Sequence, residues 1–276
     1  TSASAITATL CSRYGARPDS ATLPFLGLIR LRASLTALVG LLWITCASAV
    51  PLILVVEGVN PYRMLLPVLG AAAVPAAAWE DGYLQRSPLA DALRHASGGE
   101  LRRIAWSGVP TDQTGLRDAV DLLEAELAAA KDQAREVCLI THSLGSVIAY
   151  LALADGGGRM PVQAFISLSS PLGRPPILQW LAQAHPDLPL ANLAVGVQGP
   201  AGLGVGRWIN VYTAWDPLAG PILAEGVENR ALQLLPAGLL PTPADLILAH
   251  TLPFRDAGTV SRIVGEFTDA SALSSQ

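Results

Sequence analysis

Short apolar runs alternate with helical patterns along much of this chain. The runs Val137–Thr141 and Val162–Leu168 are rich in β-branched residues and short enough to be buried strands. Between them, Leu144–Leu153 has the length and composition of an apolar helix. In Asp112–Arg135 apolar residues recur at helical spacing, which predicts an amphipathic helix with a solvated charged face. The alternation predicts an α/β domain with a mostly parallel sheet and flanking helices.

Weaker patterns extend this arrangement on both sides. Ser87–His95 has a short helical pattern, and Leu101–Trp106 is predicted to be a strand. Arg207–Trp215 alternates between apolar and polar residues, which indicates another strand. Val260–Phe267 is predicted to be a terminal helix.

Residues 174–206 are rich in Pro and Gly and are expected to leave the regular pattern. Within them, Gly202-Leu-Gly204-Val-Gly206 has the glycine spacing of a dinucleotide-binding loop. It follows no predicted strand and opens no predicted helix, so it lacks the context that such a loop needs. We interpret it as a flexible loop.

The N-terminal part holds a long uncharged run, residues 33–56, preceded by Arg30 and Arg32. A run of this length can span a bilayer, and the two arginines favour a cytoplasmic side before it. It can also be a signal peptide that is cleaved after Ala47-Ser48-Ala49. A third interpretation is a helix followed by a buried strand over Leu52–Val56.

We predict membrane association through residues 33–56, with secreted and cytoplasmic locations as the alternatives. The chain is accordingly divided into an N-terminal segment, residues 1–60, with an anchor or signal-like helix, and an α/β domain, residues 61–276.

Composition narrows the function classes. Hydrophobic residues make up 51% of the chain and charged residues 14%, with a mean hydropathy of +0.42. Charged residues are therefore scarcer than in typical soluble domains, where they are about 25%. The net charge of −4 and the absence of a basic patch make nucleic acid an unexpected partner. Cys11, Cys46 and Cys138 lie far apart, so neither a disulfide framework nor a zinc site is predicted.

Ser143 stands at the junction between the predicted strand Val137–Thr141 and the predicted helix Leu144–Leu153. A sharp strand-to-helix turn exposes the serine hydroxyl at the edge of the sheet. Gly145 lets the helix start close to the neighbouring strands, and the Leu144 amide points to where an oxyanion would form. These features predict a nucleophilic serine.

The segment THSLGSVIAY resembles the G-H-S-L-G-G elbow of lipases, esterases and thioesterases of the α/β-hydrolase family. Thr141 stands where that pattern usually has Gly, so the turn must accept a bulkier side chain. The resemblance covers about residues 68–267. It implies the α/β-hydrolase fold and a bacterial lipase- or esterase-like serine hydrolase with Ser143 as the nucleophile.

In that family the catalytic triad follows the order Ser, acid, His, which separates the four histidines of this chain. His95 precedes Ser143, and His142 is its neighbour, with a side chain expected to point away from it. His185 precedes the favoured acid, whereas His250 lies after every strong acid candidate. We therefore expect His250 to be the general base.

Asp216 is the expected acid because it directly follows the predicted strand Arg207–Trp215, and loops at the carboxyl ends of parallel strands gather ligands. WINVYTAWDPLAG also looks like the W-x-N-x-Y…D-P-V-x-G segment that carries the triad acid in lipase-like relatives. The weaker acid candidates are Asp155, Asp187, Glu225, Glu228 and Asp245.

The oxyanion hole needs a second amide besides that of Leu144. In some bacterial α/β-hydrolases it comes from a strand ending in His-Gly shortly before a tryptophan, and this chain has no His-Gly. Val68–Ala71 or Val56–Val59 can stand in its place. The first has the better spacing to Trp79, so we expect Ala71 to supply the second amide.

Together these residues predict a serine hydrolase that cleaves carboxylic esters, of small molecules or lipids, through an acyl-enzyme on Ser143. No P-loop, HExxH motif or paired acidic metal site is present, so neither a cofactor nor a metal is expected. Two alternatives stay open. The same triad can transfer the acyl group to an alcohol, or the chain is an inactive, membrane-anchored interaction module.

Overall fold

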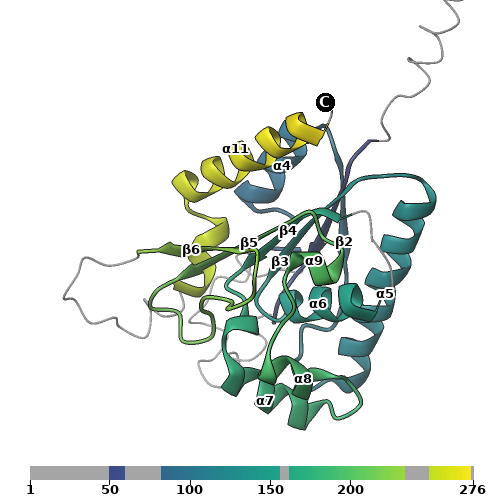
Figure 1. The fold of residues 1–276 in the computed structure, drawn as a ribbon, viewed down its shortest axis with the longest axis vertical. Coiled ribbons are helices and arrows are strands. Elements are labelled where there is room, and N and C mark those ends of the chain that lie inside the picture. Colours follow the sequence, from purple (N-terminus) through teal and green to yellow (C-terminus); the bar gives the residue numbers. More distant parts are fainter. Residues whose placement is uncertain (1–49, 60–81, 156–161, 234–248, 275–276) are drawn as a thin grey trace, which may run out of the picture. The chain divides into compact units, whose positions relative to one another are not determined.

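The computed structural model describes residues 50–59, 82–155, 162–233 and 249–274 (Figure 1). Within these residues the strands form a six-stranded sheet of order β2-β1-β3-β4-β5-β6, in which every neighbouring pair is parallel. The strands are β1 Leu52–Val56, β2 Glu100–Ile104, β3 Val137–His142, β4 Val162–Leu168, β5 Arg207–Thr213 and β6 Val227–Leu232. The predicted α/β architecture is confirmed.

Helices flank both faces of this sheet (Figure 1). On one face α4 and α11 lie side by side. On the other, α6 lies against β1 and β3, α5 lies beside α6 and against β2, and α7, α8 and α9 lie beyond them. The helices are α4 Pro88–Ser97, α5 Gln113–Asp132, α6 Gly145–Asp155, α7 Pro175–Ala184, α8 Leu190–Val195, α9 Pro200–Leu203, α11 Ala257–Ser274 and the short 3₁₀ helices η3 Pro171–Gly173 and η4 Leu252–Phe254.

The central strands are mostly apolar because both of their faces are covered. In β1, Leu52, Leu54 and Val56 belong to the core under α5 and α6, whereas Ile53 and Val55 belong to the core under α4 and α11. Side chains alternate between the two faces of a strand, so a strand buried on both sides has few polar positions. This explains why β1 and residues Val137–Ile140 of β3 appear in the sequence as unbroken apolar runs.

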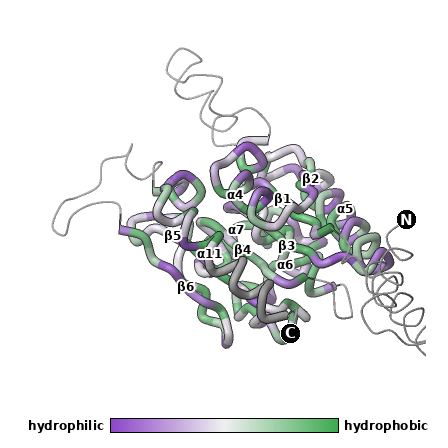
Figure 2. The backbone as a smooth tube through the Cα atoms, turned by 90° about the horizontal axis from the view of Figure 1, so that it is seen from above, coloured by the Kyte–Doolittle hydropathy of each residue, from purple (hydrophilic) through white to green (hydrophobic). Residues whose placement is uncertain are grey.

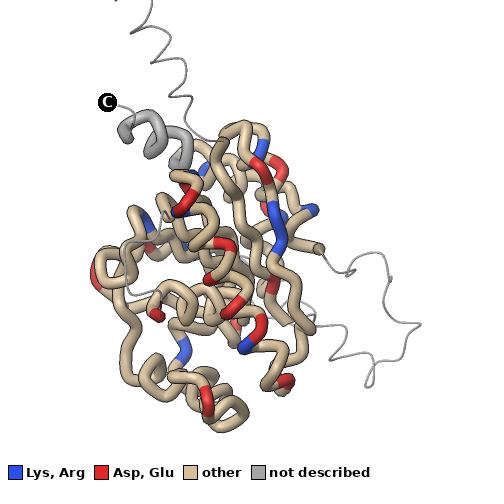
Figure 3. Tube along the Cα trace, turned by 90° about the vertical axis from the view of Figure 1, so that its right-hand side faces the viewer, with Lys and Arg blue, Asp and Glu red and all other residues tan. Residues whose placement is uncertain are grey.

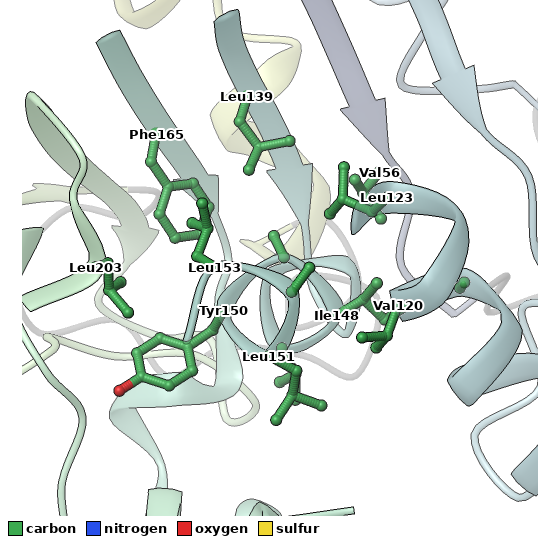
Figure 4. Close-up of a cluster of buried hydrophobic side chains, with 14 of the residues drawn as sticks. Val56, Val120, Leu123, Leu139, Ile148, Tyr150, Leu151, Leu153, Phe165 and Leu203 are labelled. Carbon is green, nitrogen blue, oxygen red and sulfur yellow. The ribbon is translucent and has the colours of Figure 1, made fainter. Parts of the chain in front are cut away.

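Helix α6, which follows Ser143, is buried all around. Every residue from Gly145 to Leu153 is buried. In Figure 4 its side chains radiate in several directions: Ile148 lies near Val120 of α5, and Tyr150 extends on another side. A helix that is hydrophobic on all sides belongs in a protein core. The position of Ser143 is therefore tied to the packing of the whole domain.

Polar residues concentrate at the edges of the sheet. Figure 2 shows hydrophobic colouring along β3, whereas β6 carries several hydrophilic residues. Acidic and basic residues lie interspersed in the view of Figure 3. On the edge strand β2, Arg102 pairs with Glu126 of α5 at 2.5 Å and with Glu100 at 2.7 Å. These ion pairs join partly exposed side chains at the edge of the sheet.

Two segments differ from the sequence prediction. Strand β6 was not expected, because Val227–Leu232 has no apolar alternation, yet it pairs along its whole length with β5. Residues 174–206, expected to be irregular, contain α7, α8 and α9. The glycine-rich stretch interpreted as a flexible loop includes the end of α9, where Gly204 ends the helix in the left-handed conformation.

The N-terminal predictions are only partly within the described residues. Residues 52–56 form the buried strand β1, as one of the three interpretations of residues 33–56 expected. Strand β1 pairs with both β2 and β3 and so belongs with the rest of the sheet. The predicted boundary at residue 60 stays a prediction, because residues 60–81 lie outside the described residues. Residues 33–49 lie outside the described residues, and membrane association stays a prediction. Among the described helices, none combines the length and hydropathy needed to cross a membrane.

Candidate active site

Ser143 occupies the sharp turn between β3 and α6 that the sequence predicts. Its φ angle is +52°, in the left-handed region that non-glycine residues rarely adopt. Its amide donates to Leu168 O at 2.9 Å, and its carbonyl accepts from Ser146 N at 2.9 Å at the start of the helix. The residue is 8% exposed. Strained backbone of this kind persists where the surrounding structure holds it and is concentrated at functional sites.

Gly145 is required by the close approach of α6 to the end of β1. A Cβ atom at this position would lie 2.3 Å from Val56 O and 2.7 Å from Glu57 O. Both neighbours are backbone atoms that cannot rotate away. The sequence expectation that Gly145 permits close helix–strand packing is confirmed.

Thr141, the departure from the family's usual glycine, is accommodated by hydrogen bonds. Its side chain is fully buried, and its Oγ1 lies 2.9 Å from Ser146 Oγ and 3.3 Å from Ile166 O. A buried hydroxyl is costly only when it lacks a partner. Thr141 therefore links β3 to the first turn of α6 and the adjacent strand β4.

The loop after β1 borders Ser143 directly. A Cβ atom on Gly58 would lie 2.4 Å from Ser143 Cβ and 3.2 Å from Ser143 Oγ. Of the two oxyanion-loop alternatives, Val56–Val59 thus lies beside the serine. Ala71, the preferred residue, lies outside the described residues. Within the described part of the chain, neither the Leu144 amide nor the Val59 amide has a hydrogen-bond partner.

Asp216 and His250 are hydrogen-bonded to one another. Asp216 Oδ2 lies 2.8 Å from His250 Nδ1, and Asp216 Oδ1 accepts from Leu218 N at 2.9 Å. Burial by itself would raise the pKa of Asp216, but the hydrogen bond and charge of His250 outweigh it, so the pKa of this carboxyl is lowered. The carboxylate is therefore ionised and accepts the Nδ1 proton. This leaves Nε2 of the neutral imidazole as a base.

Three hydrogen bonds hold the loops that carry this pair. Thr213 Oγ1, at the end of β5, donates to Ala249 O at 2.8 Å, next to His250. Arg174, which precedes α7, donates from Nε to Ala219 O at 2.8 Å and from Nη2 to Asp216 O at 3.1 Å. The acid and the histidine are thereby fixed at the carboxyl edge of the sheet.

His142 connects Ser143 to this pair. It precedes Ser143 in the chain, and its Nε2 lies 2.9 Å from His250 O, with the two ring centroids 4.8 Å apart. Its ring is buried. Ser143, Asp216 and His250 therefore gather in one region. Among the described residues, no hydrogen-bond partner is found for Ser143 Oγ.

The other candidates lie in different environments. His185 is buried with Nε2 2.5 Å from Pro110 O, and Asp187 pairs with Arg117 on the surface. Glu228 pairs with Arg207 across β5 and β6. His95 is exposed in the last turn of α4, and Asp245 lies outside the described residues. Among the described residues no group of three metal-binding side chains is found.

The chain matches no protein-family model and no curated protein. Similar solved structures include an esterase from Pyrococcus furiosus, with 12% identity and a TM-score of 0.45, over 81% of each chain. A soluble variant of monoglyceride lipase from Saccharomyces cerevisiae has 10% identity and a TM-score of 0.45, over 81% of this chain and 86% of that one.

An uncharacterized protein from Bacillus cereus is also similar, at 13% identity and a TM-score of 0.36. That match covers 75% of this chain and spans 60% of the other. Likeness at these levels carries no information on the reaction, so we interpret the site from its own geometry.

Proposed function

We propose that this protein is a serine hydrolase of the α/β-hydrolase superfamily that cleaves carboxylic esters with Ser143, Asp216 and His250. The observation that carries the proposal is the 2.8 Å hydrogen bond between His250 Nδ1 and buried Asp216, at the same edge of the sheet as the strained turn of Ser143. This arrangement supplies a nucleophile, a base and a group that orients the base.

In the first half of the reaction, His250 Nε2 takes the proton of Ser143 Oγ as the oxygen attacks the ester carbonyl. Asp216 stays ionised and stabilises the imidazolium that forms. His250 then passes the proton to the departing alkoxide, which leaves as an alcohol. The acyl group remains on Ser143 as an ester.

The tetrahedral oxyanion needs two donors, and the Leu144 and Val59 amides suit this role. Both are unpaired within the described residues, and both flank the contact between Gly58 and Ser143. Backbone amides that are fixed in place stabilise the developing charge without reorganisation. We therefore assign the second donor to the loop after β1.

In the second half, His250 takes a proton from water, and the hydroxide oxygen attacks the acyl carbonyl of the Ser143 ester. The tetrahedral intermediate collapses with return of the proton to Ser143 Oγ. The products are a carboxylic acid and the free enzyme. Atoms and charge balance without a metal or a redox cofactor.

Labelling with a fluorophosphonate probe tests the proposal. Wild type should be labelled, Ser143→Ala should not, and Asp216→Asn and His250→Ala should react at least about 10³-fold more slowly, as triad variants do. Matched controls are Ser97→Ala, Asp187→Asn and His95→Ala, which change the same residue types away from Ser143. A folded wild type that neither labels nor hydrolyses p-nitrophenyl esters would overturn the proposal.

A further inference from the structure

A chain of buried hydrogen bonds joins the loop after β1 to the loop that carries His250. Gly58 N donates to Tyr83 Oη at 3.0 Å, and Tyr83 Oη lies 2.6 Å from His142 Nδ1. His142 Nε2 in turn lies 2.9 Å from His250 O. Tyr83 is 8% exposed and His142 is 1% exposed. The proposed mechanism uses neither side chain.

The direction of each hydrogen bond in this chain is determined by chemistry. The carbonyl of His250 can only accept, so His142 Nε2 carries the hydrogen. In a neutral imidazole Nδ1 is then the acceptor, and Tyr83 Oη–H donates to it. The tyrosine oxygen accepts from the Gly58 amide. Burial, followed by the charge of His250, lowers the pKa of His142 to about 3, so the ring is neutral at pH 7.

Glu57 holds the turn on which Tyr83 lies. Its buried carboxylate accepts from Gly82 N and Leu84 N, each at 2.9 Å, on either side of the tyrosine. Arg103 Nε lies 3.5 Å from the same carboxylate. Because Glu57 directly precedes Gly58, the loop after β1 is tied to the tyrosine turn at two successive residues.

Aromatic packing restricts the same groups. Phe254 of η4 lies four residues after His250 and contacts both rings, with centroid distances of 4.9 Å to His142 and 5.7 Å to Tyr83. Rings held by both packing and hydrogen bonds have few alternative rotamers. A side chain locked in this way is suited to hold its neighbours in place.

We propose that Tyr83 and His142 are positioning residues, which hold the oxyanion loop and the His250 loop at a fixed separation around Ser143. The inference rests on the proposed function and extends it to groups that do not touch the substrate. The loop after β1 supplies one oxyanion donor, and the His250 loop supplies the base. These groups act on opposite sides of one carbonyl, so a displacement of about 1 Å between them would slow the reaction about 10²-fold.

The first test compares two tyrosine hydroxyls. Tyr83→Phe removes the oxygen between Gly58 and His142. Tyr150→Phe on α6 is the matched control, and it removes a hydroxyl that accepts from Gln198 N at 2.7 Å. We expect Tyr83→Phe to lower kcat about 10- to 100-fold with KM within about twofold of wild type, because positioning affects the transition state. Equal kcat in the two variants would overturn the proposal.

The second test asks which hydrogen bond of the His142 ring matters. His142→Phe removes both ring nitrogens, whereas His142→Gln keeps an amide that reaches the Nε2 position and donates to His250 O. We expect kcat to fall most in the phenylalanine variant and to be partly restored in the glutamine variant. Wild-type kcat in a folded His142→Phe protein would contradict a positioning role.

A measurement without substrate separates this inference from the proposed function. Nitrogen NMR should show His142 as the neutral Nε2–H tautomer from pH 5 to 8. The histidine signals are assigned with variants in which one histidine at a time is replaced. The His250 Nδ1 proton, bonded to Asp216, should be visible in wild type and Tyr150→Phe, and broadened in Tyr83→Phe. An Nδ1–H tautomer, or an unchanged His250 proton in Tyr83→Phe, would overturn the positioning proposal even in a protein that hydrolyses esters. Both signals as expected in a protein without hydrolysis would overturn the proposed function alone.

Discussion

Gly145→Ala should destabilise the fold through the contact between α6 and the end of β1. The added Cβ would lie 2.3 Å from Val56 O and 2.7 Å from Glu57 O. Carbon–oxygen contacts are ordinarily about 3.3 Å or longer, so the two elements must separate by about 1 Å. Overpacking of this kind costs about 1–3 kcal/mol, and two rigid backbone carbonyls favour the upper part of that range.

The matched control is Gly265→Ala in α11, where an added Cβ meets nothing within 4 Å. In a helix interior this change should stabilise by about 0.5–1 kcal/mol. With a shift in Tm of about 2–4 °C per kcal/mol for a domain of this size, thermal unfolding should separate the variants clearly. Gly145→Ala should lower Tm and slow fluorophosphonate labelling, whereas Gly265→Ala should do neither. A Gly145→Ala protein with wild-type Tm and labelling rate would refute the reasoning.

Three further outcomes follow from the same region. The pKa of His142 is near 6.5 in the unfolded chain and about 3 in the folded protein, so between these pH values only the unfolded chain binds the proton. The free energy of unfolding therefore falls as pH decreases through this window, by at most about 1.4 kcal/mol per pH unit. Urea unfolding at pH 7 and pH 5 should therefore show a smaller loss in His142→Gln than in wild type, and equal losses would contradict this assignment. Thr141→Val leaves Ser146 Oγ without its 2.9 Å partner and should cost about 1–3 kcal/mol in urea unfolding; an unchanged midpoint would be inconsistent with that hydrogen bond. Arg174→Met removes the donors to Ala219 O and Asp216 O, so probe labelling should slow about tenfold while the fold is retained. An unchanged labelling rate would show that the loop with Asp216 keeps its conformation without Arg174.

Much of the sheet and its covering helices was predictable because buried positions are mostly occupied by apolar residues. A strand covered on both faces is largely apolar, and β1, β3 and β4 all are, apart from Thr141, His142, Gln163 and Ser167. The turn at Ser143 was predictable because it needs a strand, a small residue and a helix in succession. Chain order then separated His250 from the other histidines.

Strand β6 was missed because its stability comes from the backbone. Its residues Val227–Leu232 pair with β5 through main-chain hydrogen bonds, and the strand stands at the edge of the described sheet with half-exposed side chains. Such a strand needs no apolar alternation. The helices of residues 174–206 were missed for a different reason. α7 and α9 each begin with proline at the first position, where its missing N–H costs nothing, although proline usually indicates a break.

The proximity of the loop after β1 to Ser143 follows from strand register and not from spacing along the chain. In the register of β1 with β3, Val56 lies opposite Thr141. Glu57 and Gly58 therefore reach the level of His142 and Ser143. The link from Tyr83 to His142 spans 59 residues and leaves no periodic signal, so no sequence pattern predicts it. Contacts between residues this far apart in the chain can be predicted only after the register of the strands is known.

The strain at the carboxyl edge of the sheet has a common structural cause. Ser143 and Ser169 are non-glycine residues with φ of +52° and +48°, and each directly follows a strand. The Ser143 amide donates to Leu168 O on β4 at 2.9 Å, and the Ser169 amide donates to Val211 O on β5 at 2.8 Å. Each strained residue thus extends the sheet by one more hydrogen bond to the next strand. Because these hydrogen bonds hold both backbones in an unfavourable conformation, the chain can turn sharply at the ends of two adjacent strands, β3 and β4.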